Sequence, residues 1–133
     1  MAAILTDLPA GHAFQPLSFK IDAARARSYR EAAGDATPAY DEAGFVPPLA
    51  VAAFALGALL ESVGLPAGSL HASESVTFVE PVAPDARAVC RASLAQRSQR
   101  SGWIVSVLDS EIEVDGRTAL RTRATVLSPV APA

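Results

Sequence analysis

The sequence predicts an α+β domain in which an antiparallel sheet of about five strands wraps around a long central apolar helix. Two patterns indicate this architecture. The stretch from 48 to 63 is apolar on every face, which is typical of a helix buried inside a domain. The second half of the chain alternates between apolar and polar residues, and Asp115-Gly116 is its strongest hairpin signal.

The composition fits one domain in a reducing compartment. The chain has 133 residues, half of them hydrophobic, so we expect a single domain over 1–133 with a core from about 12 to 129 and flexible ends. A net charge of −3 with scattered arginines argues against a nucleic-acid partner. Cys90 is the single cysteine and the N-terminus lacks a basic signal-peptide start. We therefore expect a cytoplasmic protein with no disulfide and no metal site.

The first predicted elements are a strand, a helix and a loop. The stretch "HAFQPLSFKI" (12–21) is the strand. A helix over 22–34 follows because Asp22 is a good N-cap, alanine and arginine favour helix, and Gly34 can end it in a left-handed conformation. The next stretch, "ATPAYDEAGF" (36–45), is rich in turn-forming residues and predicts a loop.

The apolar helix is predicted over about 48–63, ending at Gly64. Pro47 and Pro48 suit its start, where missing N–H groups cost least. The uncharged run 43–60 approaches membrane-spanning length, but the two prolines leave a helix of roughly 18 Å at 1.5 Å per residue. That is too short for a bilayer core of about 30 Å, so we expect no membrane partner.

Four strands are predicted after this helix, over 70–82, 86–99, 102–114 and 117–129. The last two are joined by Asp115-Gly116, whose residues favour a tight hairpin turn. In the last strand, alternation places Ala119, Arg121 and Arg123 on one side.

Several stretches, in this order, resemble the MaoC-like dehydratase family, most closely its N-terminal, FAS1-like branch. "REAAGDATPAYDEAGF" is similar to the family's acidic loop and "FVPPLAVAAF" to the start of its central helix. "LHASESVTFVEPVAPDARA" is similar to the family's second strand and "EVDGRTALRTRATVLSP" to its closing hairpin. The resemblance covers about residues 12–129 and implies a hot-dog fold, in which the sheet wraps the central helix.

The resemblance also implies a catalytic loop, from which this sequence departs. Active members carry G-D-x-N-P-x-H, with aspartate and histidine as the acid–base pair acting on a 3-hydroxyacyl or 2-enoyl thioester. Gly34, Asp35 and Pro38 match, whereas Thr37 replaces the asparagine and Tyr40 the histidine. Histidine titrates near neutral pH and suits proton exchange, whereas a tyrosine ordinarily titrates near about pH 10.

A second departure lies at the start of the central helix. Active hydratases of this fold commonly carry a histidine-glycine pair there, whose N–H groups polarise the thioester carbonyl. The corresponding place holds Pro47-Pro48, and proline has no N–H, which leaves Leu49 or Ala50 as donors.

The resemblance also implies the candidate site residues. Asp35 and Tyr40 are the candidate catalytic residues, and Thr37, Pro48, Leu49 and Trp103 the candidate substrate-binding residues. Asp35 has the alternative role of hydrogen-bonding the loop that follows it, and Tyr40 and Trp103 that of packing. His71, alone at a strand start, is typical of a structural or surface residue. Four arginines could contact the phosphates of coenzyme A or an acyl carrier protein, or be solvated: Arg97, Arg100, Arg121 and Arg123.

Three functions remain compatible with the sequence. The first is an (R)-specific enoyl-thioester hydratase or 3-hydroxyacyl-thioester dehydratase, a lyase of fatty acid metabolism, with weak or absent activity of its own. The second is a non-catalytic subunit of a heteromeric dehydratase, and the third is a hot-dog thioesterase using Asp35 or Glu42. The expected ligand is an acyl-CoA or acyl-carrier-protein thioester, with no further cofactor. Because a lone hot-dog leaves a sheet edge uncovered, we expect a homodimer or a heterodimer with a related subunit.

Overall fold

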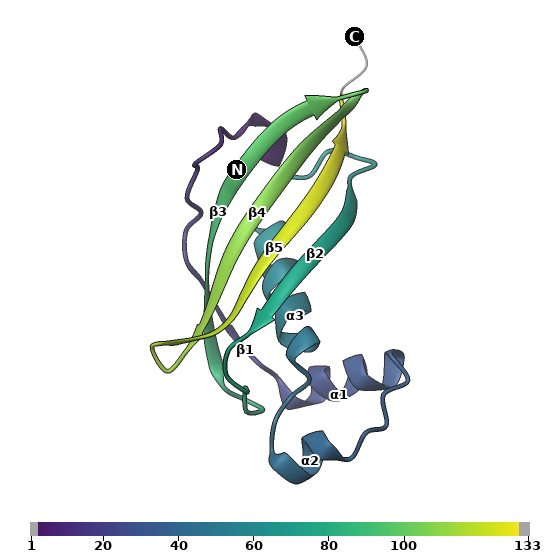
Figure 1. Cartoon of the computed structure of the whole chain (residues 1–133), viewed down its shortest axis with the longest axis vertical. Helices are drawn as coiled ribbons and strands as arrows, with labels where there is room; N and C mark the ends of the chain where they lie inside the picture. Colours follow the sequence, from purple (N-terminus) through teal and green to yellow (C-terminus); the bar gives the residue numbers. More distant parts are fainter. Residues whose placement is uncertain (1–2, 131–133) are drawn as a thin grey trace.

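The computed structural model describes residues 3–130 and has a helix held against one curved sheet (Figure 1). A short 3-10 turn, η1 (Leu5–Asp7), comes first. The helices are α1 (Ala23–Ala32), α2 (Ala39–Ala43) and α3 (Pro48–Glu61). The strands are β1 (Leu17–Lys20), β2 (Leu70–Phe78), β3 (Arg87–Arg100), β4 (Trp103–Val114) and β5 (Arg117–Pro129).

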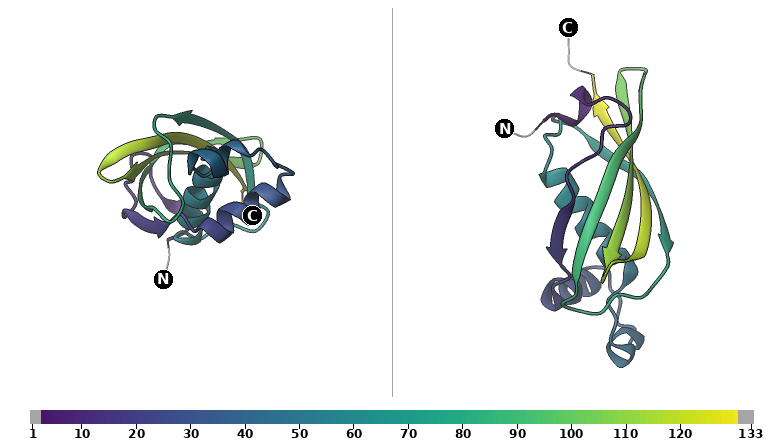
Figure 2. Two further views of the ribbon diagram at one scale, coloured as in Figure 1. Left: turned by 90° about the horizontal axis from the view of Figure 1, so that it is seen from below. Right: turned by 90° about the vertical axis from the view of Figure 1, so that its left-hand side faces the viewer.

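The five strands form one antiparallel sheet in the order β1-β3-β4-β5-β2. The sheet curls around α3, which Figure 2 shows lying inside the curve. The strands β1 and β2 are the two edges. The predicted α+β architecture, with five antiparallel strands and a central helix, is confirmed.

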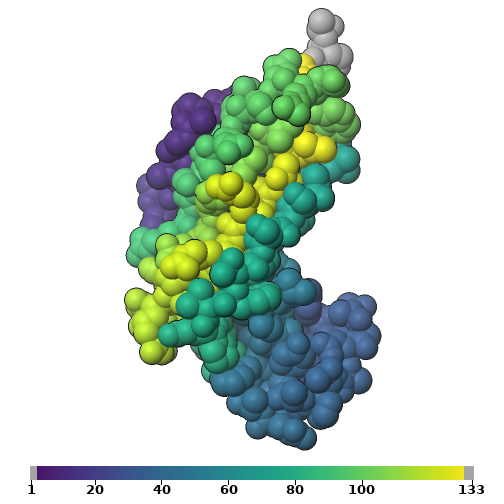
Figure 3. All heavy atoms as spheres, in the orientation of Figure 1, coloured from purple at the N-terminus to yellow at the C-terminus, as the bar shows by residue number. Residues whose placement is uncertain are grey.

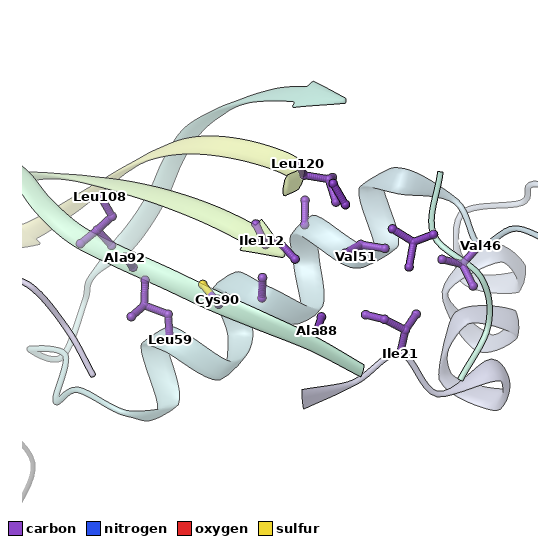
Figure 4. Close-up of a cluster of buried hydrophobic side chains, with 14 of the residues drawn as sticks. Ile21, Val46, Val51, Leu59, Ala88, Cys90, Ala92, Leu108, Ile112 and Leu120 are labelled. Carbon is purple, nitrogen blue, oxygen red and sulfur yellow. The ribbon is translucent and has the colours of Figure 1, made fainter. Parts of the chain in front are cut away.

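The core lies between α3 and the concave face of the sheet (Figure 4). Val51, Ala55 and Leu59 from α3 are almost fully buried, and they meet buried residues of the strands such as Leu108 and Ile112. Burying one such leucine or isoleucine contributes roughly 1.5–3 kcal/mol. The buried alanines of α3 let its backbone approach the sheet closely.

The opposite face of α3 is not buried, which differs from the expectation of a helix covered on all sides. Leu49 is 54% exposed, and Ala53 and Gly57 are also exposed. These residues recur every four positions and form one stripe along the helix. A single sheet can cover only the half of the helix that faces it, so the apolar sequence of α3 leaves this stripe without a partner in one chain.

Two predicted elements differ in extent. The strand predicted over 12–21 is regular only over Leu17–Lys20, because Pro16 has no N–H to donate to the sheet. The loop predicted over 36–45 contains α2, which begins after Pro38 and ends at Gly44 in the left-handed conformation. The turn-forming residues Pro38 and Gly44 therefore mark the two ends of a short helix.

The N-terminal segment is packed over its described part, unlike the flexible end expected before residue 12. Leu5 is fully buried, and its N–H donates to the Gly64 carbonyl. The Arg97 guanidinium donates to the Thr6 carbonyl at 2.8 and 3.0 Å. The outermost residues, 1–2 and 131–133, for which flexible ends were also expected, lie outside the described residues.

A bulge changes which face the residues of β5 occupy. Between Ile112 and Glu113 the register of β4 against β5 shifts, so that Ala119 is an extra residue and is buried. The prediction that Ala119 shares a face with Arg121 and Arg123 was therefore wrong, because alternation breaks at a bulge.

None of the helices within residues 3–130 is long and apolar enough to cross a membrane.

Candidate functional site

The predicted catalytic aspartate lies where α1 ends. Gly34 has a φ of 69° and turns the chain out of the helix. The Asp35 carboxylate then accepts the Thr37 N–H at 3.0 Å, which closes a turn of its own loop. Thr37 lowers the pKa of Asp35 below its usual value, through its hydroxyl and its N–H, and the Arg30 charge adds a smaller effect in the same direction.

Arg30, which the sequence analysis did not single out, holds this loop in place. One of its terminal nitrogens donates to the Thr37 carbonyl at 2.8 Å and the other to the Asp41 carboxylate at 3.0 Å. Its guanidinium also lies over the Tyr40 ring, 5.3 Å from the centroid. Because Arg30 is on α1 and Asp41 is on α2, these contacts tie the two helices together across the loop.

Asp35 and Tyr40 do not form a hydrogen-bonded pair in the described part of the chain. Tyr40 packs beneath the guanidinium, whereas Asp35 is engaged with Thr37. Asp35 borders an open hollow of about 420 Å³ whose other charged residues are Arg27, Arg30, Glu31 and Asp41. The loop therefore positions a carboxylate with a lowered pKa beside an arginine, without a neighbouring imidazole.

The start of α3 supplies few backbone donors. Pro47 is the N-cap and Pro48 the first helical residue, as predicted from their positions. The Ala50 N–H donates to the Pro47 carbonyl at 3.0 Å. Of the two donors considered from the sequence, this leaves the N–H of Leu49.

The exposed stripe of α3 forms one wall of a groove, and β2 forms the other. The groove has a volume of about 450 Å³. Figure 3 shows a hollow on this side of the molecule, between β2 in teal and the helices in blue. Most of its lining is apolar and includes Leu49, Leu56, Leu60 and Val76, while Tyr29, His71 and Glu74 add polar groups.

His71 and Glu74 are a pair that the sequence analysis missed. His71 Nε2 lies 3.3 Å from a carboxylate oxygen of Glu74, whose side chain is only 15% exposed. Burial raises the pKa of Glu74, and the nearby His71 acts in the opposite direction. Simple alternation puts residues 71 and 74 on opposite faces of β2, so only knowledge of the bulge after His71 could have revealed the pair.

The remaining candidate residues lie apart from the acidic loop. Trp103 begins β4 at the end of the sheet opposite to α1 and α2 (Figure 1). Cys90 is buried in the core, and burial raises the pKa of its thiol, which does not favour a nucleophile. Arg123 forms two hydrogen bonds with Asp109, at 2.7 and 2.8 Å.

On the outer face of the sheet, other arginines also lie close to carboxylates of neighbouring strands. Arg91 pairs with Glu113 at 2.9 Å, and Arg121 lies 3.9 Å from Glu111. Arg97, as described above, is bound to the N-terminal segment. These pairings favour solvated or structural arginines over a phosphate-binding cluster.

Solved structures with the same architecture show that the chain has the hot-dog fold. A MaoC-like dehydratase from Rhodospirillum rubrum is 18% identical, with a TM-score of 0.77 over 99% of this chain and 100% of that one. R-hydratase PhaJ1 from Pseudomonas aeruginosa is 13% identical, with a TM-score of 0.77 over 98% and 88% of the two chains. The HadBC (3R-hydroxyacyl-ACP dehydratase) complex from Mycobacterium tuberculosis is 17% identical, with a TM-score of 0.76 over 92% and 99%.

The family follows from the sequence itself. The model of the FAS1-like dehydratase domain region matches residues 9–119, and the chain belongs to this family. A search of curated proteins gave no match. The predicted family and hot-dog fold are thus confirmed.

Proposed function

We propose that this chain is an acyl-thioester-binding subunit of an (R)-specific enoyl-thioester hydratase or 3-hydroxyacyl-thioester dehydratase, with weak or absent activity of its own. A related hot-dog domain would supply the histidine. The observation that carries the proposal is the state of the acidic loop, in which Asp35 is held by Thr37 while Tyr40 packs against Arg30. No imidazole takes part in this arrangement.

The chemistry of hydration explains why this arrangement is poorly suited to catalysis. One group has to activate water, and another has to exchange a proton at the carbon next to the carbonyl. A general base works best when its pKa is near the working pH, whereas the pKa of Asp35 is lowered further below it. The first turn of α3 adds to this, because its two prolines have no N–H for the thioester oxygen.

Pairing with a second hot-dog domain is supported by the surfaces that one chain leaves open. The edge strand β2 has exposed apolar residues, Leu70, Phe78 and Val79, at its ends and just beyond, and it borders the open stripe of α3. Edges of this kind favour pairing with another strand. The HadBC dehydratase, which shares the fold, is a complex. We therefore propose a dimer joined along the edge β2, with a related subunit as the partner that gives an active enzyme.

The test is an assay of crotonyl-CoA hydration with the purified chain, alone and with a hot-dog partner that carries the G-D-x-N-P-x-H loop. We expect little turnover by the chain alone and a higher rate per partner active site in the mixture. Turnover by the chain alone above about 1 s⁻¹, within the ordinary enzyme range, would refute the proposal. Binding of decanoyl-CoA, measured by calorimetry, tests the ligand class separately from turnover.

A further inference from the structure

A bulge brings His71 and Glu74 to the same side of β2. Residues three apart on a regular strand point to opposite faces of the sheet. The register of β2 against β5 shifts between His71 and Ser73, and Ala72 is the extra residue. His71 consequently lies opposite Val126 and Glu74 opposite Ala124, both of which are buried.

The pair lies in the groove between α3 and β2, where most of the lining is apolar. Removing a carboxylate from water costs free energy unless hydrogen bonds compensate. His71, at 3.3 Å, is the partner that the structure gives to Glu74. Bulges are frequent beside functional sites, where they redirect a side chain. A largely buried carboxyl beside a more exposed imidazole, in a groove lined mostly by apolar residues, is therefore a candidate recognition element.

We propose that this groove binds an acyl chain and that His71 and Glu74 recognise a hydroxyl or keto oxygen carried along that chain. The proposal rests on the proposed function, which supplies the acyl thioester. An imidazole beside a carboxyl offers both a donor and an acceptor, which together match a hydroxyl group. Plain acyl chains would instead leave this pair desolvated and without a ligand partner.

The dimensions of the groove agree with an acyl chain. Leu49 and Gly57 both line it, and the eight helical steps from one to the other correspond to about 12 Å at 1.5 Å per residue. The volume of about 450 Å³ is within the range of small-ligand sites. Leucine, alanine and valine side chains line this length and would contact the acyl chain, while His71 and Glu74 supply polar groups on the β2 side of the groove.

The test compares decanoyl-CoA with hydroxydecanoyl-CoA isomers that differ in the position of the hydroxyl. Calorimetry measures their affinities for the full chain and for three variants: Glu74→Leu, His71→Leu and Ser75→Ala. Ser75 is the matched control because it is the next residue after Glu74 and borders the hollow on the outer face of the sheet. The ratio of the two affinities is the readout, because a partly unfolded variant changes both by the same factor.

We expect at least one isomer to bind the wild type tenfold or more tighter than decanoyl-CoA. Glu74→Leu and His71→Leu should abolish that preference while decanoyl-CoA still binds, and Ser75→Ala should keep it. If decanoyl-CoA binds but no isomer is preferred, or if the variants lower the melting temperature and leave the ratio unchanged, the pair is structural and the inference is wrong while the proposed function stands. If decanoyl-CoA binding weakens as protein concentration rises, a second copy fills the groove, which also overturns the inference. If none of the thioesters binds, the proposed function fails as well.

Discussion

Removal of the Arg30 guanidinium should release α2 and the loop before it. The side chain of Arg30 is only 14% exposed, and Arg30→Met keeps its apolar stem while removing both hydrogen bonds. A charged hydrogen bond to the Thr37 carbonyl contributes about 1.5 kcal/mol. The ion pair with Asp41 contributes only about 0.5 kcal/mol, because Asp41 is 77% exposed.

The contact with the Tyr40 ring adds about 0.5 kcal/mol. The buried Arg30 Nε, which has no hydrogen-bond partner within residues 3–130, offsets part of this total. The net effect is about 2 kcal/mol, which corresponds to a roughly 30-fold larger population of the open loop. Because α2 has only five residues, it depends on these contacts rather than on its own stability.

Amide hydrogen exchange measures this change directly. The Glu42 and Gly44 amides, which donate to the Pro38 and Tyr40 carbonyls, report on α2. Their exchange should be roughly 30-fold faster in Arg30→Met, while amides in the centre of β4 should be unaffected. Arg27→Met is the control, since Arg27 is exposed on the same helix. Equal exchange in the two variants, or unprotected α2 amides in the wild type, would refute the reasoning.

Four further outcomes are expected. The pKa of Asp35 is lower in the folded protein than its unfolded value of about 3.9, so its ionised carboxylate stabilises the fold above that pH, and this contribution is lost as the pH falls through the folded pKa. By NMR the Asp35 carboxyl should titrate below about 3.9, and its pKa should rise in Thr37→Val. Tyr40→His should raise the crotonyl-CoA hydration rate and Asp35→Asn should abolish any such rate; an unchanged rate in both variants would exclude the loop from catalysis. Ser101 has a φ of 48° in the β3–β4 turn, so Ser101→Asn should raise stability by about 0.5 kcal/mol in urea unfolding, and a loss would contradict the turn assignment. Light scattering should show a dimer, or a heterodimer with a related subunit, and a stable monomer at tens of micromolar would count against pairing along β2.

The fold was predictable because its signals are local and repeated. The alternation of β3, β4 and β5 extends over long strands, so a single irregular residue did not hide it. The hairpin at Asp115-Gly116 has the expected left-handed conformation at both residues, with φ of 54° and 75°. The apolar helix was found for the same reason, and Pro48 begins it.

The site was less predictable because it depends on contacts between residues far apart or out of phase. Arg30 and Asp41 are eleven positions apart, and neither spacing nor composition indicates their hydrogen bond. The acidic-loop motif indicates Asp35 and Tyr40, but a motif does not say which side chains surround them. The exposed stripe of α3 was also hidden, since an apolar sequence does not say which half of a helix the sheet covers.

The bulge in β2 shows how one extra residue can decide what a groove recognises. Without Ala72 as an insertion in the register, His71 would point to the outer face, away from Glu74. Glu74 would then be a lone carboxyl in an apolar groove, and its pKa would rise further because the nearby His71 now lowers it. An unpaired carboxyl offers a different set of donors and acceptors from a carboxyl–imidazole pair. The irregularity of β2 therefore determines the chemistry of the groove, whereas the regular strands determine its shape.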